Sequence, residues 1–149
     1  MRIVPITAGE LREHASAMLR AHWSEVAKKK HLMVLDPDWD RYEALEEAGK
    51  LFGVAAYDDD RLVGYSLNIV DRHLHYQGLV VGQNDVVFVD PDYRGARVFP
   101  LLQRASEEIA KRNGAQLFLM HAKEGSALDQ LLRKRSEWAV QDIIYAKEL

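Results

Sequence analysis

The chain has 149 residues, of which 48% are hydrophobic and 29% are charged, and its formal net charge is −3. This is the composition of an ordinary globular protein, and the length predicts a single domain over residues 1–149 with one core. A small negative charge argues against bulk binding of nucleic acid. The sequence contains no cysteine, which excludes a disulfide, a thiolate metal site and a cysteine nucleophile.

Targeting signals are not visible in the sequence. No apolar run approaches the roughly 18 residues that a transmembrane helix needs. Residues 1–5, MRIVP, do not form the apolar core of a signal peptide. We therefore expect a cytoplasmic protein that does not enter a membrane.

The first third of the chain predicts one strand and two helices. Residues 3–6 are an apolar run, and Thr7 with Glu10 forms the pattern of a capping box at a helix start. A helix is expected from residue 11 because apolar positions recur every three or four residues. These positions are Leu11, Ala15, Met18, His22 and Val26. A second helix should begin after residues 36–38 and stop at Gly49.

The middle of the chain reads as strands. Residues 51–57 and 61–70 flank a polar turn and predict a hairpin. A polar, aromatic connection, HLHYQ at 73–77, leads to a further strand region at 79–89. The sequence GQND at 82–85 interrupts that region, and this break fits either a bulge or a tight turn.

The last third predicts alternating helices and strands. Helices are expected at 100–113 and 126–135, with a buried strand at 115–121 between them. Two closing strands are expected at 138–140 and 143–146. Because a strand–helix–strand unit follows a run of strands, the order favours an α/β fold with a mixed sheet.

The segment 86–102, VVFVDPDYRGARVFPLL, carries the most specific chemical signal. An apolar strand runs into a short loop, and the loop feeds a helix that Pro100 opens. Backbone N–H groups and the positive end of the helix dipole converge at such a junction, so it is suited to hold an anion. The segment therefore predicts an anion-binding loop.

Within this segment, residues 89–95 read VDPDYRG, and they resemble the V-x-P-x-Y-R-G lead-in of the GCN5-related N-acetyltransferases. The resemblance covers nearly the whole chain, because the expected order of elements is also that of the family. It implies a GNAT-like, mixed and mostly antiparallel twisted sheet of about six to seven strands with about four helices. A narrower resemblance is to acetyltransferases of this fold encoded by phages and prophages. It rests on Pro37-Asp38-Trp39, Tyr42, Leu62-Val63-Gly64-Tyr65, His73-Leu74-His75-Tyr76 and Asp85.

The family resemblance also implies a reaction and its partners. Acetyl-CoA is the expected cosubstrate, without a metal, and the acetyl group passes directly to an amine on a small molecule or a protein. Pairing into a homodimer is a further implication. The cofactor-binding positions carried over from the family are Val87, Phe88, Val89, Arg94, Gly95, Ala96, Arg97, Val98, Phe99 and Ser126.

The loop departs from the usual family pattern, Q/R-x-x-G-x-G/A. Arg97 stands where a glycine is expected, and Phe99 stands at the final small residue. Glycine permits a close approach of the backbone to phosphate, whereas Arg97 offers its own charge. Pro100 has no N–H to donate. In the later helix, Arg133 occupies the place where the family usually carries a tyrosine general acid.

Three residues are candidates for the chemistry, each with a plainer alternative. Asp85 lies beside the loop and is a candidate general base, or else a turn aspartate that bonds local backbone. His75 is a candidate because histidine is a common acid–base residue in catalysis, but it also fits an exposed loop beside His73. Arg133 could stabilise a departing thiolate by its charge, or it could be a solvated arginine of the run at 133–135.

Two further functional interpretations stay open. The same fold could be a non-catalytic module that binds CoA or a protein, which the altered loop and the missing tyrosine favour. A nucleotide-binding protein is a weaker interpretation, because no G-x-x-x-x-G-K-[ST] loop is present. His73 and His75 have no evident third ligand, so no metal site is expected. Trp39 and Tyr42 either shape an acceptor pocket or belong to the core.

Overall fold

The computed structural model describes residues 1–95 and 97–149. Within this part of the chain, the strands form one sheet in the order β1-β2-β3-β4-β5. They are β1 (Arg2–Ile6), β2 (Leu51–Asp58), β3 (Arg61–Arg72), β4 (Val80–Val89) and β5 (Leu117–Leu119). The α-helices are α1 (Ala8–His14), α2 (Ser16–Val26), α3 (Trp39–Glu47), α4 (Val98–Arg112) and α5 (Ala127–Arg133), and a 3-10 turn, η1 (Pro91–Tyr93), follows β4.

The sheet is mixed. Strands β1 to β4 pair as antiparallel neighbours, and β5 pairs parallel to β4. The described residues thus confirm an α/β fold with a mixed sheet, but the expectation of six or seven strands is wrong. Residues 138–140 and 143–146 form no strand. The side chains of Val140, Ile143, Ile144 and Tyr145 are 60% to 87% exposed, so no packing against the sheet stabilises an extended conformation there.

The helix count is also higher than expected, because the helix predicted from residue 11 is two helices. Ala15 separates α1 from α2 with φ −110° and ψ 10°, which are not helical values. Its side chain is completely buried in the core. The apolar periodicity is therefore real, but the chain bends at Ala15 to follow the sheet.

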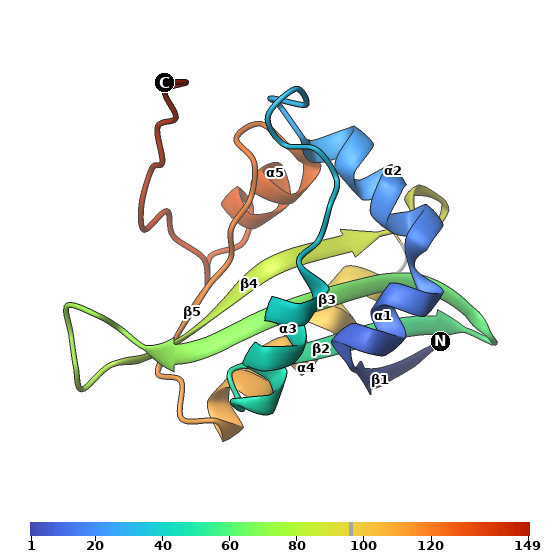
Figure 1. Cartoon of the computed structure of the whole chain (residues 1–149). Coiled ribbons are helices and arrows are strands. Elements are labelled where there is room, and N and C mark those ends of the chain that lie inside the picture. The colour runs from blue at the N-terminus through green and yellow to red at the C-terminus, as the bar shows by residue number, and fades with distance from the viewer. Residues whose placement is uncertain (96) are drawn as a thin grey trace.

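Two layers of helices cover the sheet (Figure 1). Helices α1, α2 and α3 lie over one face, where residues such as Leu11, Tyr65 and Phe88 form a buried cluster. Helix α4 lies on the other face, where Val63, Val98 and further residues form a second cluster. We call these the three-helix face and the α4 face. The core is thus divided by the sheet into two halves.

Helix starts follow the capping signals of the sequence. The Thr7 side chain accepts a hydrogen bond from the Glu10 N–H, and the Glu10 carboxylate accepts one from the Thr7 N–H, which confirms the capping box. Asp38 and Ser126 cap α3 and α5 in the same way through their side chains. The predicted start of the helix at Pro100 is wrong, because α4 begins two residues earlier, at Val98.

A network of neutral polar groups is buried between the sheet and α4. The amide of Asn68 on β3 donates to Ser106 Oγ on α4 at 3.1 Å and to the Phe52 carbonyl at 3.3 Å. Its oxygen accepts from Ser66 Oγ at 3.0 Å. Because buried polar groups are costly when unpaired, this network fixes how α4 sits on the sheet.

Gly82 allows close packing where β4 meets both α4 and β5. A Cβ atom at this position would lie 2.7 Å from Ala110 Cβ and 2.9 Å from the Phe118 ring. The missing side chain therefore lets β5 pair with β4 beneath the end of α4.

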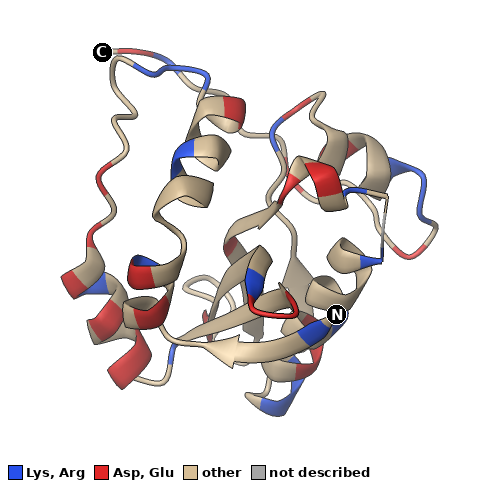
Figure 2. Cartoon of the chain, turned by 90° about the vertical axis from the view of Figure 1, so that its right-hand side faces the viewer, with Lys and Arg blue, Asp and Glu red and all other residues tan. Residues whose placement is uncertain are grey.

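Charge is spread over the molecule. In Figure 2, segments that carry Lys or Arg alternate with segments that carry Asp or Glu. None of the helices in the described ranges is long and apolar enough to cross a membrane.

Candidate functional site

The break in the sequence of β4 is a β-bulge centred on Asp85. Asn84 pairs with Asn68 and Val86 pairs with Leu67, so Asp85 has no partner on β3. A bulge redirects the extra side chain and bends the strand. Here the Asp85 carboxylate accepts a hydrogen bond of 2.5 Å from the hydroxyl of Tyr42 on α3. The bulge therefore places an exposed carboxylate on the three-helix face.

Tyr42 is suited to remain a donor to this carboxylate. Burial of its hydroxyl raises the pKa of Tyr42 well above its ordinary value, and the hydrogen bond to Asp85 and the charge of that residue add to the effect. The Trp39 ring lies beside Tyr42, with 5.8 Å between the ring centroids. Tyr42 thus contacts Asp85, and Trp39 lies next to Tyr42 on the same helix.

His22 on α2 lies on the same face and was not singled out from the sequence as a site residue. Its Nδ1 is 2.9 Å from the hydroxyl of Tyr65, and its ring stacks on Phe88 at 4.8 Å. Burial lowers the pKa of His22 to about 4, while the charge of Glu25 opposes this and that of Arg94 adds to it. His22 is therefore neutral at physiological pH.

Strands β4 and β5 separate next to the bulge. Their pairing ends at Gln83 and Leu119, while β4 continues to Val89. At the point of separation the Asn84 side chain bonds the backbone of His121 twice, accepting from its N–H at 2.5 Å and donating to its carbonyl at 3.2 Å. Asn84 was not singled out from the sequence as a site residue either. Beyond it, no described strand pairs with β4 on that side.

The connection from β4 to α4 is a tight turn. Arg94 and Arg97 form an isolated antiparallel bridge, and Gly95 has φ +86°, a left-handed value that favours glycine. No side chain caps the start of α4, and its first turn holds no acidic residue. The N–H groups of Val98 and Phe99 and the positive helix end therefore lack a side-chain partner, as an anion site requires.

The Arg94 side chain contacts both β4 and α2. Its Nε donates to the Val89 carbonyl at 3.0 Å, and its two terminal nitrogens donate to both carboxylate oxygens of Glu25 at 2.9 and 2.6 Å. Its guanidinium also lies 5.2 Å from the centroid of the Phe88 ring. The side chain is thus held between β4 and α2.

The other predicted cofactor residues are placed unevenly. Phe88 turns its ring to His22 and Tyr65 on the three-helix face, and the Val98 side chain is fully buried, so each offers mainly backbone to a ligand. Ser126 uses its hydroxyl to accept from Asp129 N at the start of α5. Val87 and Val89 lie on β4 beyond the end of its pairing with β5, while Gly95, Arg97 and Phe99 lie in the loop and the first turn of α4. Ala96 lies outside the described residues.

Two of the predicted catalytic residues make contacts away from Asp85. His75 lies in the β3–β4 connection, where its ring is 6.5 Å from that of His73 and its N–H donates to His73 Nδ1. Arg133 on α5 donates to Asp129 at 2.8 Å, one turn earlier in the helix. The structure therefore does not bring these two residues together with Asp85.

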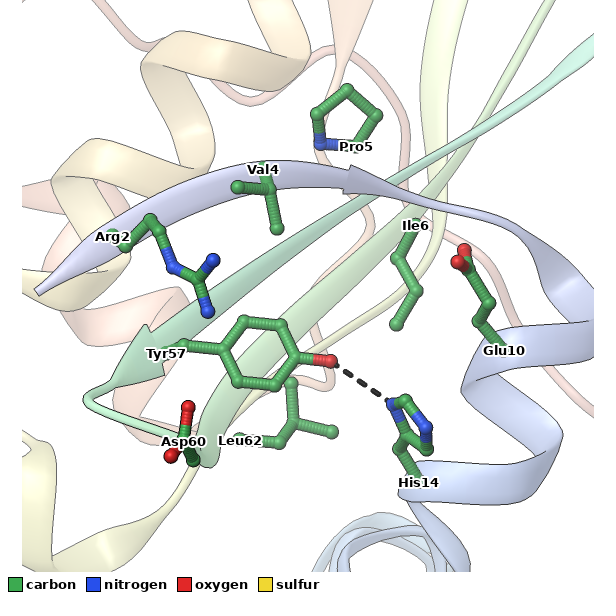
Figure 3. A pocket seen from close by; sticks show the side chains of 9 residues that line it. All are labelled: Arg2, Val4, Pro5, Ile6, Glu10, His14, Tyr57, Asp60 and Leu62. Atoms are coloured by element: carbon green, nitrogen blue, oxygen red, sulfur yellow. Dashed lines mark hydrogen bonds between the residues drawn. The ribbon is translucent and has the colours of Figure 1, made fainter.

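A cavity lies at the opposite edge of the sheet and is distinct from this site. It has a volume of about 560 Å³ and is bordered by β1, α1 and the β2–β3 hairpin (Figure 3). His14 Nδ1 is 3.2 Å from the Tyr57 hydroxyl at its wall. None of the residues that line this cavity belongs to the bulge or to the loop before α4.

Comparison with protein families gives a match to the acetyltransferase (GNAT) family over residues 11–128. The match covers most of the chain and includes the second half of α1, helices α2 to α4, the bulge, the loop and Ser126. The chain therefore belongs to the GNAT acetyltransferase family. A search of curated proteins finds no match.

Solved structures share the whole fold. A mutant of the BH1408 protein from Bacillus halodurans superposes with a TM-score of 0.78 at 15% identity, covering 100% of this chain and 99% of the other. Aminoglycoside 6'-N-acetyltransferase AAC(6')-IG from Acinetobacter haemolyticus gives 0.68 at 19% identity, with 100% and 99% covered. AAC(6')-Iy, in complex with a bisubstrate analogue, gives 0.65 at 18% identity, with 99% and 98% covered. At such identities the likeness shows the fold.

Proposed function

We propose that this protein transfers an acetyl group from acetyl-CoA directly to an amine. The observation that carries the proposal is the bulged Asp85, which lies next to the separation of β4 from β5 and bonds Tyr42 at 2.5 Å. A carboxylate where the strand pair opens, on the strand that leads to an uncapped helix start, combines a proton acceptor with an anion site. Membership of the GNAT family supports the reaction class.

The cosubstrate would lie along β4 and end at the loop. Residues 87–89 pair with β3 on one side only, and amide-bearing pantetheine could pair as a strand would with those of their backbone groups that point to the side that β5 has left. The pyrophosphate would meet Gly95, Arg97 and the N–H groups of Val98 and Phe99. The bisubstrate analogue bound to AAC(6')-Iy contains CoA, which is consistent with this placement in a shared fold.

Asp85 would act as general base. A lysine-type amine has a pKa of about 10.4, so it arrives protonated and must lose a proton before it can attack. Asp85 takes this proton, directly or through water, and Tyr42 orients the carboxylate by donating to it. The amine nitrogen then bonds to the thioester carbon and the C–S bond breaks. The leaving thiolate takes up the second proton of the amine nitrogen, and a thiol pKa of about 8.5 makes it a tolerable leaving group.

The acceptor would approach from the three-helix face, where Tyr42 bonds Asp85 and the Trp39 ring lies beside Tyr42. The carboxylate attracts a cationic amine by its charge, and the aromatic rings add cation–π contact. The fold is shared with an aminoglycoside acetyltransferase and with a ribosomal-protein-alanine N-acetyltransferase from Brucella melitensis, so both small-molecule and protein amines stay candidates. Roles for His75 and Arg133, a homodimer and a phage or prophage source stay predictions from the sequence.

A non-catalytic module that binds CoA is the second candidate. Arg133 forms a local ion pair with Asp129 at the position where the family usually carries a tyrosine acid, and this favours the alternative. The two candidates differ in turnover and agree on CoA binding, so two measurements separate them.

The first measurement is a thermal-shift titration with CoA. A ligand at about 100 times its Kd stabilises the folded state by roughly 2.7 kcal/mol, so the unfolding midpoint should rise by several degrees. No shift at millimolar CoA would refute the cofactor site. The second is release of free thiol from acetyl-CoA across a panel of aminoglycosides, polyamines and lysine peptides. The protein contains no thiol, so the signal comes only from CoA. Release with an amine supports the enzyme, and binding without release supports the module.

A further inference from the structure

Helix α2 carries two side chains, one turn apart, that contact the residues leading into the cofactor loop. His22 stacks on Phe88 with 4.8 Å between ring centroids, and Glu25 forms a bidentate pair with Arg94 at 2.9 and 2.6 Å. Arg94 in turn lies 5.2 Å over the same Phe88 ring. Phe88 is 5% exposed, so the three contacts form one packed unit between α2 and the end of β4.

A second tie reaches from α2 to the other side of the strand separation. Lys28 follows the end of α2, and its Nζ donates to the carbonyl of Glu124 at 3.3 Å. Glu124 lies in the connection between β5 and α5. The end of α2 and the residues just after it therefore contact both sides of the opening between β4 and β5. A movement of either side would displace this helix.

The pairing of Arg94 leaves it able to contact a ligand as well. A guanidinium has five N–H groups, and the contacts with Val89 and Glu25 use three of them. Both side chains of the pair are partly exposed, at 36% for Arg94 and 44% for Glu25, so the ion pair itself adds little stability. What it provides is geometry, because a bidentate pair fixes the plane and direction of the guanidinium.

We propose that Glu25 is a positioning residue that couples the cofactor loop to the acceptor side of the sheet, by holding Arg94 against α2. The proposal rests on the proposed function, since it assumes that CoA binds at the loop. When phosphate binds the remaining N–H groups of Arg94, the guanidinium moves toward it. Glu25 and helix α2 move with the guanidinium because of the bidentate pair. His22 and Tyr65 lie on the same helix-to-sheet contact, so the acceptor face is reshaped when the cosubstrate is bound.

Trp23 provides a reporter for this movement. It lies between His22 and Glu25 in the sequence, its indole N–H donates to the Met33 carbonyl, and Lys30 Nζ lies 5.4 Å from its ring. The chain has three tryptophans. Trp39→Phe with Trp138→Phe leaves Trp23 as the single tryptophan, and this background would be titrated with CoA while its fluorescence and heat of binding are recorded.

The decisive variant is Glu25→Gln, which keeps the size of the side chain and removes its charge. We expect CoA to bind this variant while the change in Trp23 emission on binding falls to less than about half of the parent value. Arg94→Lys keeps a positive charge but cannot form the bidentate pair, so it should lose the same signal. Glu108→Gln is the matched control, because it removes an Arg–Glu pair on α4, at 3.7 Å from Arg112, and should leave the signal intact.

Kinetics provide a second measurement once an accepted amine is known. In Glu25→Gln the KM for the amine should rise by about 5-fold or more at saturating acetyl-CoA, while kcat changes less than about 2-fold, because Asp85 is untouched. Equal emission changes in parent and Glu25→Gln, with CoA bound to both, would overturn the coupling and leave the proposed function standing. Failure of CoA to bind the parent would overturn both.

Discussion

The two faces of the sheet use polar groups in different ways. On the α4 face, Asn68, Ser66 and Ser106 form a buried network of neutral groups that bond one another. On the three-helix face, the polar contacts involve groups that titrate or carry charge, namely Tyr42 with Asp85, His22 with Tyr65, and Arg94 with Glu25. Neutral groups thus fix α4 on the sheet, whereas the titratable and charged pairs lie on the three-helix face.

This division has a physical reason. A neutral network can be buried fully at modest cost when every member is paired. The proposed base needs access to its substrate, and Asp85 is exposed at the bulge. Substitutions on the α4 face should therefore change stability at any pH. Substitutions on the three-helix face should change activity or the dependence of stability on pH.

The largest effect is expected at the base. Asp85→Asn removes the proton acceptor but keeps the shape of the side chain, so turnover with an accepted amine should fall by roughly 100-fold or more. Thiol release measures it, and CoA affinity by calorimetry should stay within about 3-fold. Asp71→Asn, on β3 in an exposed ion pair with Lys50, is the control. Normal turnover of Asp85→Asn would remove Asp85 as base.

The second effect is a pH dependence of stability from His22. The folded protein binds this proton only near pH 4, whereas an unfolded histidine binds it near pH 6.5. Between these values the unfolded state binds more protons, so stability is complete above about pH 6.5 and falls as the pH drops toward 4, by about 3 kcal/mol at most.

Urea unfolding at pH 7 and pH 5 would measure this loss. In His22→Phe the part of the loss that comes from His22 should vanish, while His75→Gln, which changes an exposed histidine, should keep it. If His22→Phe loses as much stability on acidification as the parent, His22 does not titrate as the structure implies.

The third effect lies on the α4 face. Asn68→Ala leaves Ser66, Ser106 and the Phe52 carbonyl without their partner in a buried place, so the free energy of unfolding should fall by about 2 kcal/mol. Unlike the loss from His22, this one should be the same at pH 7 and pH 5. Asn113→Ala, at an exposed helix end, is the control and should cost less. A loss of stability in Asn68→Ala that varies strongly with pH would contradict the proposed difference between the two faces.

The smallest effect is expected at Tyr42. Tyr42→Phe removes the hydroxyl that orients Asp85 but keeps the ring, so turnover should fall by about 10-fold, which corresponds to the roughly 1.4 kcal/mol of one good hydrogen bond. Thiol release gives the rate, and Tyr76→Phe, at an exposed tyrosine, is the control. A rate equal to that of the parent would show that Asp85 does not depend on Tyr42.

Much of the fold followed from local signals in the sequence. Thr7 with Glu10 predicted the start of α1, Asp38 that of α3, and the 58–60 turn the β2–β3 hairpin, because capping and turn chemistry act within a few residues. The family motif around Arg94 and Gly95 pointed to the loop that the structure forms. The two strands predicted at 138–140 and 143–146 were wrong, because apolar residues form a strand only where other residues pack on them.

The sequence by itself determined the periodicities, the caps, the loop and the candidate base Asp85. Only the tertiary structure decided between bulge and turn at Asp85, because that choice is set by the register of β3 against β4. It also decided the partners: Tyr42, His22, Glu25 and Asn84 meet residues 43, 43, 69 and 37 positions away. Contacts at such separations leave no periodic signal in one sequence, since they depend on how whole elements pack.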